Sequence, residues 1–240
     1  MAILAIFRNT GVAMLRAPLL WFFSAVVIIT SYSISPGGNN TIWLICLSLL
    51  LIPVTVLAQA GQIRAVQLYH EGSHASISQI IRHGAGRMSS LIVVMVIGSL
   101  LMLGIAGTLW FVARSLLPQP LRPEVMVLVS WIATAIANAF ITFAQRGIVI
   151  SDLKLGASLS IVFQVLRNAA LTVVSIVVVF GFLSYFVRIL FNRSADSPAQ
   201  LAGYLIAFLI VETTQSAVFT FTYLHFVQGT QHSIRGHSDD

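Results

Sequence analysis

The segment His70-Glu71-Gly72-Ser73-His74 matches the H-E-x-x-H pattern of zinc metalloproteases. On an α-helix, two histidines four residues apart share one face and can bind zinc, while the glutamate activates a water molecule. A catalytic zinc also needs a third protein ligand, and Gly72 and Ser73 are poor residues for a helix interior. The segment therefore predicts either an intramembrane zinc protease or a polar turn between two helices.

A second candidate site surrounds Glu212, which lies near the middle of a long apolar stretch, where a carboxylate is costly and marks a functional-site hypothesis. Polar residues continue its helical face, and an earlier apolar stretch carries a matching stripe. The two stripes are Glu212, Ser216 and Thr220, and Ser130, Thr134, Asn138 and Thr142. We predict that they face each other as a polar intramembrane seam, with Glu212 neutral and hydrogen-bonded to Thr134. The seam indicates either a proton or polar-substrate path or ordinary polar packing between helices.

The overall composition identifies the environment in which these sites must work. Apolar residues make up 58% of the 240 residues and charged residues only 8%, whereas soluble domains contain about 45–50% and about 25%. The composition therefore argues against a water-soluble enzyme. The net charge is +6, but the basic residues are dispersed, unlike those of proteins that bind nucleic acid. We predict a multi-pass membrane protein with no nucleic-acid partner and no cofactor.

Apolar stretches of about 20 residues, the length needed to cross a bilayer core of about 30 Å, predict an all-α fold in a single membrane domain over residues 1–240. The six predicted spans cover residues 18–35, 41–63, 89–113, 124–145, 169–191 and 201–227. They form three helical hairpins. In the third span we expect three glycines to allow close helix packing: Gly98, Gly104 and Gly107.

The distribution of basic residues predicts the orientation of the spans. With the N-terminus inside, nine basic residues face the cytoplasm: Arg8, Arg16, Arg64, Arg82, Arg87, Arg146, Lys154, Arg167 and Arg235. Four face outward: Arg114, Arg122, Arg188 and Arg193. Both termini are therefore expected in the cytoplasm, with the chain in the inner membrane of a prokaryote and short outer loops at 36–40, 114–123 and 192–200.

Amphipathic segments precede the first, third and fifth spans and predict helices that lie in the inner interface. Ser76 or Ser78 can cap the second of these helices. Basic residues in these segments are expected to contact anionic lipid headgroups: Arg16, Arg82, Arg87 and Arg167. Because an arginine ends each segment before a span begins, we predict one unit, an interfacial helix followed by a hairpin, used three times.

The stretch Gln145-Arg146-Gly147-Ile148-Val149-Ile150-Ser151-Asp152-Leu153, followed by Leu166-Arg167-Asn168, resembles a prokaryotic family. The family comprises uncharacterised six-span proteins and the membrane domain attached to some glycerophosphodiester phosphodiesterases. The resemblance covers roughly residues 60–190. It implies the six-span architecture and a role in membrane organisation, but no phosphodiesterase activity, because the soluble catalytic domain is not part of this chain.

Three functions follow from the sequence as hypotheses. The first is a non-catalytic membrane protein that acts as a scaffold or accessory subunit of a membrane assembly, with protein partners in the bilayer. The second is a small proton-coupled transporter that uses the seam at Glu212. The third is the zinc protease at His70 and His74. A cavity that reaches Glu212 would favour transport.

Overall fold

The computed structural model describes residues 2–33, 41–116, 122–192 and 198–228, and within these ranges every long element is helical. The elements in chain order are α1 (Ala2–Arg16), α2 (Pro18–Ser33), α3 (Thr41–His70), α4 (Ile77–Ala85), α5 (Met88–Leu116), α6 (Arg122–Ile150), α7 (Leu155–Asn192), α8 (Pro198–Tyr223) and a terminal π-helical turn, η2 (Leu224–Gln228). The predicted all-α fold class is confirmed for this part of the chain. The whole predicted outer loop 36–40, residues 117–121 and 193–197 of the other two loops, and Arg235 lie outside the described residues.

Four helical segments in the described residues are long and apolar enough to cross a membrane: Met88–Leu116, Val125–Ile150, Leu155–Val187 and Gln200–Val227. The helices Ile3–Arg16 and Pro18–Thr30 meet at 89°. They add a fifth candidate if together they form one broken span. The prediction of a membrane protein with several transmembrane helices is supported by these lengths. By itself α2 has 16 residues, which corresponds to about 24 Å and is less than the hydrocarbon thickness.

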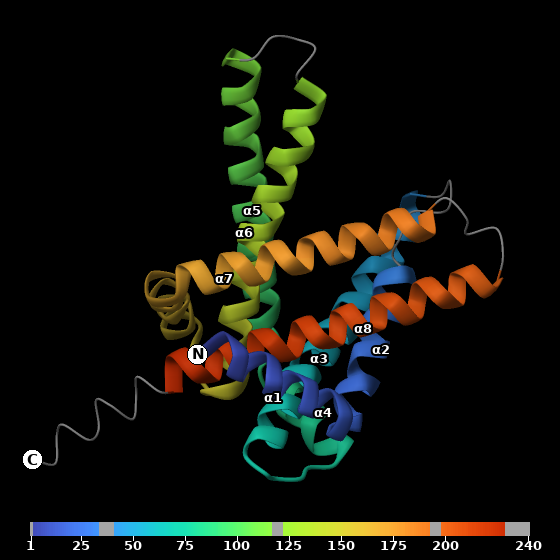
Figure 1. The fold of residues 1–240 in the computed structure, drawn as a ribbon, viewed down its shortest axis with the longest axis vertical. Helices are drawn as coiled ribbons and strands as arrows, with labels where there is room; N and C mark the ends of the chain where they lie inside the picture. Colours follow the sequence, from blue (N-terminus) through green and yellow to red (C-terminus); the bar gives the residue numbers. More distant parts are fainter. Residues whose placement is uncertain (1, 34–40, 117–121, 193–197, 229–240) are drawn as a thin grey trace, which may run out of the picture.

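Neighbouring helices in the chain pack along each other: α2 against α3, α5 against α6, and α7 against α8. Figure 1 shows α5 and α6 standing side by side at a steep angle to α7 and α8. The first helix, α1, crosses back to pack against α8, so the two ends of the described chain lie close together (Figure 1). The C-terminal halves of α3, α6 and α8 meet in the main core, which contains Val66, Phe143 and Val218.

The helical backbone is interrupted at three places in the described residues where an apolar stretch begins. Ala17 separates α1 from α2, a turn at Gly86–Arg87 separates α4 from α5, and Ala169 inside α7 has a non-helical backbone (φ −131°, ψ 22°). At α4, the hydroxyl of Ser76 accepts a hydrogen bond from the N–H of Gln79, and the Gln79 side chain accepts one from the N–H of Ser76. This capping box confirms that Ser76 begins the helix.

The three glycines of the third span do not behave alike. A Cβ atom on Gly98 would lie 2.2 Å from Cγ1 of Ile141 on α6, so this glycine does allow the close approach of α5 and α6. A Cβ atom on Gly104 or Gly107 would meet nothing within 4 Å. The predicted packing role of Gly104 and Gly107 is therefore wrong within the described residues.

Candidate functional site

Arg146, near the C-terminal end of α6, is buried with 3% of its surface exposed. Its Nε donates to the hydroxyl of Thr220 (3.1 Å), and its two terminal nitrogens donate to the backbone oxygens of Thr142 and Ser216 (both 2.8 Å). The guanidinium also lies over the ring of Phe219, 5.7 Å from its centre. The prediction that Arg146 is an exposed loop charge is therefore wrong, because α8 supplies acceptors that hold it inside the bundle.

Glu212 of α8 interacts with groups that the sequence did not indicate. It accepts a hydrogen bond from the Gln62 side chain of α3 and faces the charge of Arg146, with which it lines a small cavity of about 60 Å3. Such a volume has room for a few water molecules. The hydroxyl of Thr134 instead points to the sulfur of Met102 on α5 (3.7 Å). The predicted Thr134 partner of Glu212 is therefore wrong.

Glutamine side chains extend this polar centre across four helices. Gln62 donates to the hydroxyl of Ser24 on α2 (2.9 Å), and Gln145 of α6 donates to Gln59 of α3 (3.0 Å). Gln215, on α8, lines the small cavity beside them. Buried polar groups are stable in an apolar interior only when they are paired, so these amides form a connected polar network around the two charges.

A larger cavity of about 460 Å3 opens beside the network, among α3, α5, α6, α7 and α8. Its polar wall includes four residues of the predicted seam and three amides: Thr134, Asn138, Thr142 and Glu212, with Gln59, Gln145 and Gln215. Its apolar wall includes Trp131, Phe180 and Phe208. The structure thus brings most of the two stripes to one cavity, whose volume is typical of a small-molecule site.

The remaining seam residues have other positions. Ser130 is exposed and does not line the cavity. Ser216 and Thr220 lie deeper, where they hold Arg146. A carboxyl group that can bind a proton and several amide donors and acceptors line the cavity of about 460 Å3. The fixed cation Arg146 lines the small cavity beside it, which shares Glu212 and the glutamines with the larger one. This combination can bind a small polar solute and exchange a proton with it.

Residues at the end of α6 and in the turn that follows it make tertiary contacts. A Cβ atom on Gly147 would lie 2.7 Å from the hydroxyl oxygen of Ser158 on α7, and Ser158 donates to the backbone oxygen of Ala144. The Ser151 hydroxyl bonds to that of Tyr223 (2.8 Å). Asp152 has a positive φ of 53°. These contacts fix the end of the helix that carries Arg146.

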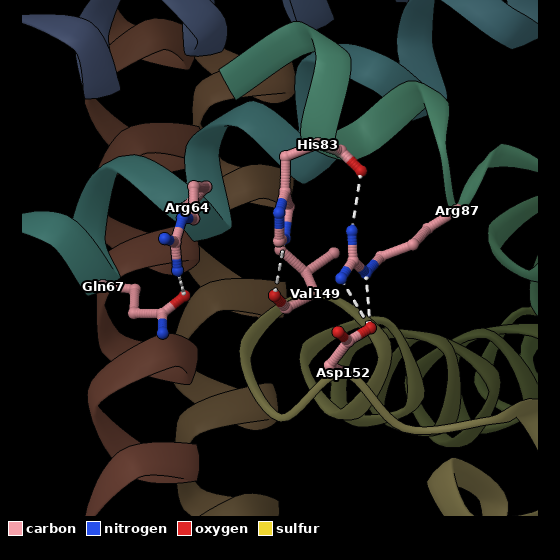
Figure 2. A network of polar contacts seen from close by, with 6 residues as sticks. All are labelled: Arg64, Gln67, His83, Arg87, Val149 and Asp152. Atoms are coloured by element: carbon pink, nitrogen blue, oxygen red, sulfur yellow. Dashed lines mark hydrogen bonds and ion pairs between the residues drawn. The ribbon is translucent and has the colours of Figure 1, made fainter. Parts of the chain in front are cut away.

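Polar contacts connect this turn and the end of α6 to α4 and to the turn before α5, and a separate hydrogen bond from Arg64 to Gln67 within α3 lies beside them (Figure 2). Arg87 forms an ion pair with Asp152 and donates to the backbone oxygen of His83 (3.0 Å). His83 in turn bonds through Nε2 to the backbone oxygen of Val149 (3.1 Å). A carbonyl can only accept, so Nε2 of His83 carries the hydrogen. Arg87 is therefore not free to face lipid headgroups as predicted, because Asp152 engages it.

Partial burial lowers the pKa of His83 below its ordinary value of 6.5, and the charges of Arg87 and Arg64 act in the same direction. The bond to Val149 and the charge of Asp152 act in the opposite direction. Since the folded state holds the proton less tightly than the unfolded state, His83 contributes stability above about pH 6.5 that is lost as the pH falls through the folded pKa.

We therefore expect the thermal unfolding midpoint in detergent to fall between about pH 7 and about pH 5. His83→Gln can keep the donor to Val149 but does not titrate, so it should flatten this part of the pH profile. His74→Gln changes an exposed histidine of the preceding loop and serves as the control. An unchanged profile in His83→Gln would contradict the assignment.

The H-E-x-x-H segment does not form the helical face that a zinc site requires. The helix α3 ends at His70, and Gly72 then adopts a left-handed conformation with φ 65°. His70 packs edge-on against Phe221, and Glu71 accepts a hydrogen bond from Gln67 (2.7 Å). Among the residues that the structure describes, no group of three potential metal ligands occurs. The zinc geometry predicted for His70, Glu71 and His74 is wrong, because the glycine interrupts the helix.

The other predicted interfacial arginines are exposed: Arg16, Arg82 and Arg167. Arg16 also lines a cavity of about 550 Å3 at the bend between α1 and α2, together with Tyr69 and His74. These three positions are compatible with contact to headgroups.

The sequence contained a signal for part of what was missed. Gln59 and Gln62 lie one helical turn apart in a predicted span, where polar residues are rare and tend to face the bundle interior. Arg146 directly follows the predicted fourth span and was assigned to the loop. Comparison of the chain with protein-family models, with curated proteins and with solved structures finds no match.

Proposed function

We propose that this chain is a small proton-coupled transporter of a polar solute, with Glu212 as the proton-binding group. The observation that carries the proposal is the cavity of about 460 Å3 that reaches Glu212. Intramembrane charges mark substrate and ion pathways in membrane proteins. Here a carboxyl group and a guanidinium lie among five helices that have the length and apolarity of spans or pack against them.

We further propose the finer architecture of six spans in three hairpins, each preceded by an interfacial helix. The breaks at Ala17, at Gly86–Arg87 and at Ala169 support a threefold repeat, because each lies where an amphipathic segment predicted from the sequence meets the following apolar helix. The similarity to the membrane domain of glycerophosphodiester phosphodiesterases stays a proposal of the same kind.

The proposed orientation places both termini in the cytoplasm of a prokaryotic cell, with the exposed arginines Arg16, Arg82 and Arg167 towards anionic headgroups. A single cysteine at position 75 or 119, in a Cys46→Ser background, tests this orientation with a membrane-impermeant thiol reagent. We expect labelling from outside at 119 only. Labelling from outside at 75 only would reverse the topology.

Transport is tested with the full chain reconstituted in liposomes that contain a pH-sensitive dye. Addition of a solute panel (small monoanions, small cations and neutral polyols) should move protons into the lumen with at least one solute. Glu212→Gln should abolish this coupled movement, because an amide cannot carry the proton. Glu71→Gln, outside the cavity, is the matched control. If no solute moves protons in the unaltered chain, the transport proposal is wrong.

A stability measurement accompanies the flux assay, since a loss of flux must not arise from unfolding. Glu212→Gln keeps the shape and the hydrogen-bonding capacity and removes only the charge that faces Arg146, so it should be less damaging than Glu212→Leu. Glu212→Leu also leaves Gln62 without its acceptor and should cost about 1 kcal/mol more. Equal damage from the two variants would show that the carboxyl charge, rather than its hydrogen bond, supports the fold.

A scaffold or accessory role remains the second candidate, and the outer faces of the long helices favour it. These faces carry large exposed apolar side chains, including Leu100, Leu103, Phe111, Leu171 and Phe182, which suit lipid or the helices of a partner subunit. Purification in a gentle detergent, followed by identification of co-purifying proteins, tests this role. A stoichiometric partner together with absent solute flux would favour the scaffold.

A further inference from the structure

The pair formed by Arg146 and Glu212 restricts the charge of the solute. Arg146 stays charged at neutral pH, because a guanidinium is not deprotonated in proteins. It is buried, and its hydrogen bonds go to neutral oxygens of Thr142, Ser216 and Thr220. Among the described acidic residues, Glu212 is the one whose charge acts on Arg146, since Asp152 pairs with Arg87 at the inner face.

An unbalanced charge in a low-dielectric interior costs several kcal/mol. The centre can be neutral overall in two ways. Either Glu212 is ionised and balances Arg146, or Glu212 carries a proton and an anion in the cavity balances Arg146. The addition of one proton together with one monoanion therefore leaves the net charge unchanged, whereas a bound cation or a proton alone leaves a net positive charge.

The polar side chains around Glu212 suit an anion. Gln59, Gln145, Gln215 and Asn138 all line the larger cavity and carry N–H donors. Glu212, Gln59, Gln145 and Gln215 also line the small cavity that Arg146 lines, so the same side chains border both the solute space and the space beside the guanidinium. A carboxylate-sized anion can accept hydrogen bonds from these amides while its charge acts on Arg146.

We propose that the cavity binds a small monoanionic solute together with one proton on Glu212, with Arg146 as the fixed counter-charge. The inference rests on the proposed transport function and names its solute class. In the proton step, a proton from water adds to a carboxylate oxygen of Glu212 and gives a neutral carboxylic acid. Release reverses the step, and the proton returns to water as the anion leaves.

Infrared difference spectroscopy of the full chain in liposomes tests this coupling. Nitrate, lactate and benzoate are the monoanion probes, and choline is the cation of comparable size. At constant pH we expect at least one monoanion to increase the carboxylic acid band that Glu212→Gln removes, with uptake of about one proton per chain. Affinity for that monoanion should rise up to about tenfold per pH unit of acidification.

Two variants distinguish the effect of the Arg146 charge on anion binding from an effect on folding. Arg146→Lys keeps a positive charge and should retain proton uptake with the monoanion. The double variant Arg146→Gln/Glu212→Gln removes both charges together, which avoids a lone buried charge, and it should lose both the band and the anion response. Retained anion binding in the double variant would overturn the inference.

The outcomes also distinguish a failure of this inference from a failure of the proposed transport function on which it rests. Proton release on choline addition, with flux of choline in liposomes, would overturn the anion assignment and leave transport standing. A solute that moves protons in the flux assay without any of the three monoanions changing the Glu212 band would likewise overturn the inference alone. If no solute moves protons in the flux assay and no monoanion changes the Glu212 band, the inference and the proposed function are both wrong.

Discussion

Arg146→Leu is expected to destabilise the folded chain by about 1.5–3 kcal/mol, because it removes the hydrogen bonds that a buried charged group makes between α6 and α8. The substitution removes the guanidinium donors to the hydroxyl of Thr220 and to the backbone oxygens of Thr142 and Ser216, although the Thr220 hydroxyl still donates to Ser216. It also leaves Glu212 without the positive charge that it faces. Unfolding in mixed micelles, followed by a helical circular dichroism signal, measures this loss.

Two controls identify the cause of the expected loss. Arg167→Leu changes an exposed arginine of the same type and should have a much smaller effect. The double variant Arg146→Leu/Glu212→Leu removes both charges and should recover part of the stability, because apolar replacement of a complete buried pair is often tolerated. A wild-type unfolding midpoint for Arg146→Leu would show that the guanidinium does not hold α6 and α8 together.

Gly61→Ala is expected to destabilise the packing of α2 on α3 by about 1–3 kcal/mol relative to a glycine replacement at an open site. A Cβ atom at this position would lie 2.5–2.6 Å from three ring atoms of Phe23. The ring is 3% exposed and packs with Val27, Ala58 and Leu68, so it cannot turn away without disturbing a second apolar cluster. Thermal unfolding in detergent provides the comparison.

Gly104→Ala is the matched control, since its Cβ atom would meet nothing within 4 Å. Both substitutions gain the higher helix propensity of alanine, about 1 kcal/mol, and the difference between them isolates the clash. Phe23→Leu in the Gly61→Ala background should relieve part of that clash. Equal stability of the two alanine variants would contradict the close contact between Gly61 and Phe23.

The positions of the helices could be predicted from the sequence, because a helix in an apolar environment satisfies its own backbone hydrogen bonds and needs only a local pattern. The predicted span at 89–113 corresponds to α5, and that at 124–145 to the greater part of α6. The capping of α4 by Ser76 was equally predictable, since it involves residues three positions apart. The left-handed Gly72 shows the converse, because a motif match carries no information about whether its residues are helical.

The candidate site was only half predictable. The stripe of Thr134, Asn138 and Thr142 and the residue Glu212 were visible as polar positions at helical spacing, and all four line one cavity. The identity of their partners was not visible. Gln62 reaches Glu212 from α3, and no local pattern states which face of one helix meets which face of another.

What the sequence determined by itself is therefore an all-α chain with several long apolar helices and an acidic residue in the last of them, because composition and periodicity are properties of each segment alone. Only the tertiary structure decided that Arg146 is inside the bundle. Its acceptors on α8 are about 70 residues away in the chain, and the rule that assigns an arginine to a loop considers only its neighbours in sequence. The charge that faces Glu212, and with it the chemistry of the cavity, exists only once α6 and α8 have packed.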